Sequence, residues 1–174
     1  MCGIAGRILN KPGNVGNDLV ELMDAQSHRG ADSTGFAVYT KPLERGFILR
    51  GMGFSKNNID SDLENLKSVL REHRSDFLKD PEVLTDSKSH YCFRLEVSDP
   101  TELSECISDI DTFSDSFEIQ SCGRSLEIIK DTGNSLEVAE KHKVRNMVGT
   151  HGLGHARLAT ESSVLPNASH PFWA

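Results

Sequence analysis

The chain has 174 residues, of which 37% are hydrophobic, and this is enough to build the core of one ordinary domain. Its formal net charge is −7 and its lysines and arginines are scattered, which argues against a nucleic-acid surface. Its apolar runs are short, and no basic start precedes an apolar stretch, so we expect neither a membrane span nor a signal peptide. We therefore predict a cytoplasmic protein with small, soluble partners.

The first part of the chain reads as a strand, a turn, a helix and a hairpin of two strands. Alternating apolar residues, glycines and helical spacing place the first strand at 3–9, the turn at 10–14 and the helix at 17–28. The two strands of the hairpin are expected at 34–40 and 45–50. Asn17 is the candidate N-cap of the helix. The segment 41–44 is the expected hairpin loop, because it carries a proline between two β-rich runs.

The middle of the chain alternates helical and strand patterns. We expect an amphipathic helix, a strand, a helix capped by Asp99 and two strands at 62–78, 91–97, 99–110, 117–121 and 126–130. We interpret about 51–130 as an inserted α/β segment. A short helix over 135–142 and a glycine-punctuated strand over 149–160 follow.

Cys2 follows Met1 directly, so removal of the methionine leaves a thiol and a free α-amine on one residue. The pKa of an α-amine is roughly 7.7–8.0, which lets it exchange a proton with the thiol near neutral pH. Such a residue can catalyse acyl transfer without a separate histidine. The alternative is a small, buried cysteine in the first strand. The other cysteines, at 92, 106 and 122, show no C-x-x-C spacing, so no zinc ribbon or iron–sulfur cluster is indicated and a reducing compartment fits.

Four segments carry motifs in a fixed order. They are 1–6 (MCGIAG), 28–35 (HRGADSTG), 154–160 (GHARLAT) and 167–172 (NASHPF). Together they resemble class II glutamine amidotransferases. The resemblance implies an α+β fold of the N-terminal-nucleophile hydrolase type, a four-layer αββα sandwich formed by residues 1–174. It also implies an enzyme that hydrolyses glutamine to glutamate and ammonia through a thioester on Cys2, with the ammonia passing to a synthase.

The resemblance also implies roles for individual residues. Arg157 corresponds to the arginine that binds the α-carboxylate of the substrate. Its planar guanidinium can donate two parallel hydrogen bonds to a carboxylate. Thr160 donates a hydroxyl beside it. Arg29 and Gly30 belong to a turn over the nucleophile, although a tight helix-to-strand connection has the same pattern. His170 lies where the family has a histidine near the pocket, and a structural histidine remains an equal alternative.

No metal or cofactor site is expected in this chain. His151 and His155 have the spacing of a helical zinc pair, but the glycines between them disfavour a helix and no glutamate follows the first histidine. The long spacer and the segments 149–155 and 159–162 most resemble stand-alone glutaminase subunits of the glutamate synthase type. The synthase partner would then hold the flavin and iron–sulfur cofactors, and no nucleic acid or membrane takes part.

The family's Asn-Gly pair, which builds the oxyanion hole after the 167–172 motif, has no counterpart before Ala174. We expect the sequence to be the N-terminal portion of a longer protein, incomplete at the C-terminus of the fold, rather than a degenerate homologue. We therefore expect negligible glutaminase activity from these 174 residues alone. Two other hypotheses stay open: a catalytically silent glutamine-binding or assembly subunit of a synthase, and an N-terminal-nucleophile hydrolase for another amide.

Overall fold

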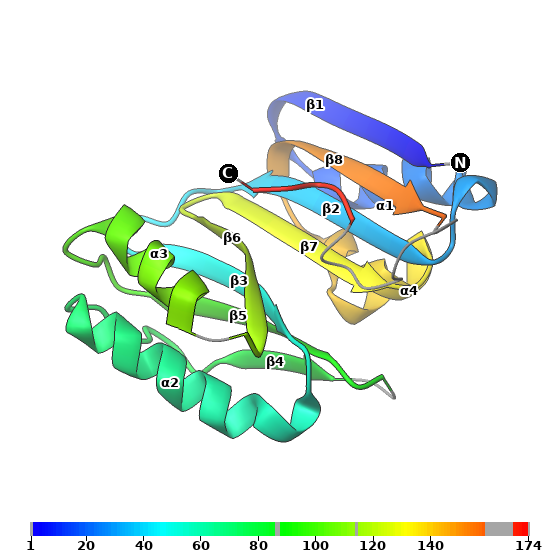
Figure 1. Ribbon diagram of the computed structural model, residues 1–174. Helices are drawn as coiled ribbons and strands as arrows, with labels where there is room; N and C mark the ends of the chain where they lie inside the picture. The colour runs from blue at the N-terminus through cyan, green and yellow to red at the C-terminus, as the bar shows by residue number, and fades with distance from the viewer. Residues whose placement is uncertain (1, 86–87, 114, 159–168, 174) are drawn as a thin grey trace. The chain divides into compact units, whose positions relative to one another are not determined.

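The structure is a computed structural model that describes residues 2–85, 88–113, 115–158 and 169–173 (Figure 1). The chain divides into two compact units. The first comprises residues 1–41 and 125–174, and the second comprises residues 42–124. Each unit contains one four-stranded antiparallel sheet with its own helices.

The sheet of the first unit has the strand order β1-β8-β2-β7. Its strands are β1 (Gly3–Gly13), β2 (Ser33–Thr40), β7 (Leu126–Thr132) and β8 (Gly149–Arg157). All three neighbouring pairs are antiparallel. β8 lies between β1 and β2, so the two segments that carry the N-terminal and 154–160 motifs are hydrogen-bonded neighbours.

One face of this sheet is covered by α1 (Val15–Asp24) and α4 (Ser135–Lys141). The core between helices and sheet is formed by Val15, Leu19, Val20, Met23, Phe36, Val38, Ile129, Val138, Ala139, Val144 and Ala156. The start of α4 is fixed by a capping box, because the Asn134 side chain accepts from the Glu137 N–H while the Glu137 side chain accepts from the Asn134 N–H.

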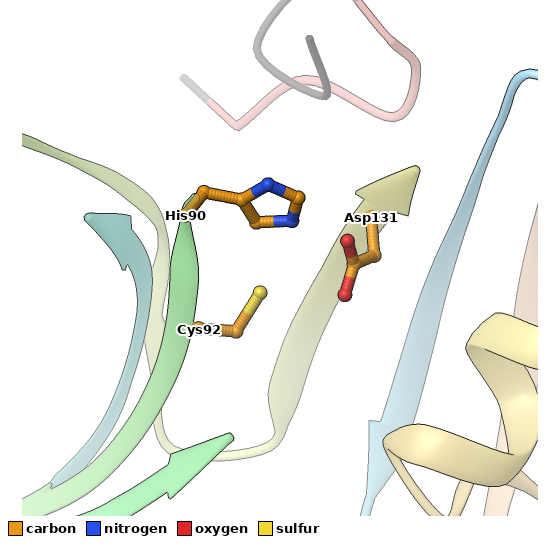
Figure 2. Close-up of side chains that lie close together, drawn as sticks. All are labelled: His90, Cys92 and Asp131. Atoms are coloured by element: carbon orange, nitrogen blue, oxygen red, sulfur yellow. The ribbon is translucent and has the colours of Figure 1, made fainter. Parts of the chain in front are cut away.

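A buried polar cluster ties α4 to the end of β7. The Asp131 carboxylate, drawn in Figure 2, lies 2.7 Å from Lys141 Nζ and 3.0 Å from His142 Nε2. Its other oxygen accepts a hydrogen bond from the Thr132 N–H. A charge without exposed surface needs such partners, so the cluster stabilises this end of the unit.

The sheet of the second unit has the order β4-β5-β3-β6. Its strands are β3 (Phe47–Gly53), β4 (Glu82–Thr85), β5 (Tyr91–Val97) and β6 (Phe117–Gly123). Figure 2 shows the side chains of Cys92 on β5 and of His90 just before it, and both are buried.

The helices α2 (Ile59–Glu72) and α3 (Leu103–Phe113) pack on one face of this second sheet. The Tyr91 hydroxyl donates to the buried Asp62 carboxylate of α2 at 2.8 Å. Because this side chain is buried beside Asp62, the pKa of Tyr91 is raised. Phe93 packs edge-on against Phe117 with ring centroids 6.1 Å apart, so aromatic side chains form the centre of this core.

The expected hairpin around 41–44 is wrong. β2 pairs with β7 and β8 in the first unit, whereas β3 pairs with β5 and β6 in the second. A proline-containing loop between two β-rich runs is typical of a connection between two sheets as well as of a hairpin. The local pattern therefore identified both strands but not their partners.

The expected turn over 10–14 is also wrong, because β1 continues to Gly13 through a register shift after Ile8. The only strand that pairs with β1 in the described sheet is β8, so Pro12 sits in an edge strand, where the missing N–H costs no hydrogen bond. The first helix correspondingly begins at Val15, with Asn14 rather than Asn17 at the N-cap position.

The two helices of the second unit are shorter than expected. α2 ends at Glu72, and Arg74 with a φ of 58° turns the chain away, so Phe77 lies outside the helix. α3 begins at Leu103 rather than at Asp99. The Asp99 carboxylate instead accepts hydrogen bonds from Gly46 N–H and from Arg124. The strand over 91–97 is confirmed as β5, and the 135–142 helix as α4 within one residue.

The chain is thus a mixed α/β protein with two antiparallel sheets, compatible with the α+β class. The N-terminal-nucleophile fold and its four-layer arrangement stay predictions. Among the described residues, no helix has both the length and the apolar character needed to cross a membrane.

Candidate functional site

The face of the first sheet opposite its helices carries the candidate residues. Side chains alternate between the two faces of a strand, and Phe36, Val38 and Ala156 point into the helix-covered core. The opposite face, here named the site face, is formed by alternate residues of three strands: Ile4, Gly6 and Ile8; Ser33, Gly35, Ala37 and Tyr39; His151, Leu153, His155 and Arg157.

Arg157 ends β8 on this face, between β1 and β2. It is paired with Ser33 of β2, and its neighbour Ala156 is paired with Gly3 of β1. Continued by one residue, the same register sets Cys2 opposite Arg157. Side chains directly opposite each other have Cβ atoms about 4.5–5.5 Å apart. Cys2 is exposed and Arg157 is half-buried, so both can be reached from solvent.

The turn that follows α1 closes around this end of the sheet. Gly30 is packed so tightly that a Cβ there would lie 2.5 Å from the carbonyl carbon of Arg157. Asp32 donates its N–H to the Arg157 carbonyl at 3.1 Å. On the other side of the turn, the Arg29 Cβ lies 3.2 Å from where a Cβ on Gly3 would be. The turn therefore packs against both the beginning of β1 and the end of β8.

The segment from Ser169 to Phe172 lies across the site face. The buried hydroxyls of Ser169 and Ser33 are 2.6 Å apart. A Cβ on Gly35 would overlap the carbonyl oxygen of His170, so the glycine is what lets this segment approach β2. Further along, the Lys130 ammonium lies 5.1 Å from the centre of the Phe172 ring. His170 itself is exposed.

His155 lies beneath His170, with ring centroids 5.2 Å apart in an edge-on arrangement. Burial lowers the pKa of His155, and the nearby His170 and Arg157 lower it further. Its imidazole is therefore neutral at pH 7, with one nitrogen that donates and one that accepts.

His151 and His155 cannot hold one ion together. Both lie on β8 and point to the same face, and four residues along a strand span about 13 Å. The ring of His151 instead stacks on Tyr39, with centroids 4.1 Å apart and the planes at 17°.

The structure brings Cys2, Arg29, Gly30, Arg157 and His170 to one end of the first unit. Thr160 and Met1 lie outside the described residues. The motifs contain Ser33, Ser169 and His155, but sequence reasoning gave none of them a role at this site. Individually, His155 was considered only as a zinc ligand, although a two-residue step back from Arg157 on a strand would have placed it on the same face.

No family model matches this chain. It is 33% identical, over 99% of its length, to a protein of Methanothermobacter thermautotrophicus named "Putative glutamine amidotransferase". It is also 29% identical, over 99% of its length, to "Glutamine amidotransferase-like protein GlxB" of Rhizobium meliloti. The matches span 56% and 54% of those proteins, so the chain covers about half the length of these relatives.

A shorter similarity covers 34% of the chain at 36% identity and 10% of a glutamine–fructose-6-phosphate aminotransferase of Methanococcus maripaludis. The names of all three relatives include the word glutamine. They support a place for this chain among glutamine amidotransferases.

Proposed function

We propose that this chain is the glutaminase part of a class II glutamine amidotransferase, with Cys2 as its nucleophile. The main support is the strand register, because it makes Cys2 and Arg157 neighbours on an accessible face. The similarity to two proteins named as glutamine amidotransferases, over 99% of the chain, supports the same activity.

In the proposed reaction, the Cys2 thiol gives its proton to its own α-amine and the sulfur attacks the side-chain amide carbon of glutamine. The α-amine then passes a proton to the departing nitrogen, the C–N bond breaks, and ammonia leaves a thioester on Cys2. Water attacks the thioester carbon, the C–S bond breaks, and glutamate and the thiol are released. The mechanism requires that Met1 be removed, because a peptide nitrogen is not a base.

Arg157 binds the α-carboxylate of glutamine in this proposal. A guanidinium offers two parallel N–H donors that match the two carboxylate oxygens. The hydroxyl donor that the motif assigns to the same carboxylate, Thr160, lies outside the described residues. Gly30 and Arg29 orient the beginning of β1, since this turn packs against both Gly3 and the Arg157 peptide. His170 lines the pocket from the segment that crosses the site face.

The ammonia acceptor is a synthase subunit or domain of the glutamate synthase type, in the cytoplasm. Its flavin and iron–sulfur cofactors reside on that partner. The segments 149–155 and 159–162 support this subtype by their resemblance to such subunits.

The test measures release of ammonia and glutamate from glutamine by the full natural protein, with and without its synthase. Cys2→Ala should lower kcat by a factor on the order of 10⁴ or more, as for loss of a nucleophile. Intact-mass analysis should find the chain starting at Cys2, and a quenched reaction should show a glutamyl adduct on that residue.

Three outcomes separate the alternatives. Glutamine binding without turnover would indicate a silent binding subunit. Turnover of other amides but not of glutamine would indicate a different hydrolase. Full activity with Met1 retained would refute the α-amine as the base.

A further inference from the structure

His155 presents a buried nitrogen for which the described residues provide no hydrogen-bond partner. The side chain is only 3% exposed, and its Nδ1 is fully enclosed. An unsatisfied buried polar atom destabilises the folded protein, and most buried polar atoms in native proteins have a partner in the protein or in ordered water. A chain that keeps a histidine there, where an apolar ring would avoid this cost, needs a reason.

The position of His155 points to the glutamine site. On β8 it lies two residues before Arg157 and on the same face, and it is paired with Ile4 of β1. The register therefore makes it the diagonal neighbour of Cys2, and such residues lie about 7–8 Å apart, with a somewhat shorter distance between their Cβ atoms. On its other side it is paired with Gly35, which has no side chain to offer a hydrogen bond.

The chemistry of His155 fits a role in orienting a ligand. Its neutral ring can donate from one nitrogen and accept at the other. It does so beside the Arg157 guanidinium without adding a second positive charge. The exposed His170 ring packs against it, so a ligand gains access to the enclosed nitrogen when the His170 side chain changes rotamer.

We propose that His155 is a positioning residue of the glutamine site, whose Nδ1 gains its hydrogen-bond partner, glutamine or a water held by glutamine, when the site fills. This inference rests on the proposed function and adds a residue to it. The expected effect is on binding rather than on the bond-breaking step.

The test compares amide variants in the full natural protein with the Cys2→Ala substitution, which prevents turnover. In His155→Asn the amide lies near the position of Nδ1, whereas in His155→Gln it reaches toward Nε2. We expect His155→Asn to keep nearly native affinity for glutamine by calorimetry. His155→Gln and His155→Phe should bind about tenfold more weakly, the size of one hydrogen bond. His151→Phe, on the same strand and face, is the control and should bind normally.

Stability separates a binding role from a structural one. Since Phe leaves no buried nitrogen unsatisfied, His155→Phe should unfold at the same or a higher temperature while it binds more weakly. Equal affinities of the Asn and Gln variants, or native affinity in His155→Phe, would overturn the role of His155 while glutamine binding by the parent protein stands. A parent protein that does not bind glutamine at all would overturn the proposed function, and this inference with it.

Discussion

Two pairs of glycines, one pair in each unit, leave room for different neighbours. In the first, Gly30 and Gly35 lie against backbone: the Arg157 peptide and the His170 carbonyl. In the second, the strand glycines Gly51 and Gly53 lie against aromatic rings, because Phe93 and Tyr91 occupy the space above them. A missing side chain brings segments together around a site in one unit and admits a large ring into the core in the other.

The same contrast appears in exposure. On the site face of the first unit, Ile4 and Ile8 are 68% and 81% exposed. In the second unit, Tyr91 and Phe93 are buried between sheet and helices. Substitutions on the site face should therefore change ligand binding more than folding, and substitutions in the core of the second unit should do the reverse.

The largest effect is expected at Arg157. Replacement by Ala should weaken glutamine binding by about 2–4 kcal/mol, as for truncating one partner of a buried charge pair. Replacement by Lys should cost nearly as much, because one ammonium cannot reproduce two parallel N–H donors. Calorimetry in the Cys2→Ala background measures both, and the unfolding temperature should stay near its native value.

Arg7→Ala provides a matched control for Arg157. Arg7 forms an exposed ion pair with Asp18 at 2.9 Å, and such pairs contribute about 0–1 kcal/mol to stability. Its loss should leave glutamine affinity unchanged. Native affinity in Arg157→Ala would remove that residue from the site.

Gly53→Ala should show the reverse pattern. A Cβ there would overlap the Tyr91 ring, and overpacking of a core typically costs about 1–3 kcal/mol. Gly6→Ala is the matched control, since the nearest atom to its new Cβ is a carbonyl oxygen at 3.7 Å. Urea unfolding should separate the two variants by at least 1 kcal/mol. Equal stabilities would contradict the packing argument.

Gly30→Ala should affect folding and binding together, with about a tenfold loss of glutamine affinity, because its Cβ would push on the Arg157 peptide. The φ of Gly30 is 176°, an extended value that alanine adopts freely, so the cost comes from contact alone. An affinity that stays native while stability falls would show that the turn is purely structural.

The last prediction concerns a core thiol of the second unit, whose effect is confined to alkaline pH. Burial, with a further contribution from Cys106, raises the pKa of Cys122 from its ordinary value of 9.0 to about 12. Between these values the unfolded chain loses this proton and the folded chain keeps it. The free energy of unfolding should therefore fall by about 1.4 kcal/mol per pH unit from pH 9 to pH 12.

Cys122→Val should reduce this slope by about that amount, measured by urea unfolding at pH 8 to 11. Identical slopes in the two proteins would show that the thiol does not determine the alkaline stability. At pH 8 and below, the pH dependence should be the same in both.

Local sequence patterns predicted several helices and strands near their observed positions, but they did not predict which strands pair with each other. The β5 run and the capping residues Asn134 and Glu137 carry their own signals, and each element formed where expected. The pairing of β2 with β8 rather than with β3 depends on contacts more than a hundred residues apart in sequence. No nearby residue encodes such a choice.

The motifs proposed residues for the candidate site, and those roles stay predictions; the arrangement of the residues could not be proposed from the sequence. The motifs named Cys2, Arg29, Gly30, Arg157 and His170, and the strand order brings their segments to one unit. The relation of His155 to Cys2 required the register of β8 on β1. A shift by one residue would have turned His155 and Arg157 into the core, so this relation could not be derived from the order of motifs.

The chain leaves the first unit at Lys41 and re-enters it at Ser125, and these two points are already adjacent within that unit. Thr40 donates its N–H to the Ser125 carbonyl at 2.9 Å, and Tyr39 is paired with Leu126. To the first unit, all of 42–124 is therefore the loop of one β-hairpin. Each doubling of a flexible loop adds only about 0.6 kcal/mol of closure entropy. The segment 42–124 can thus be lengthened, shortened or exchanged during evolution. β2 stays paired with β7, and the candidate site beside these strands is retained.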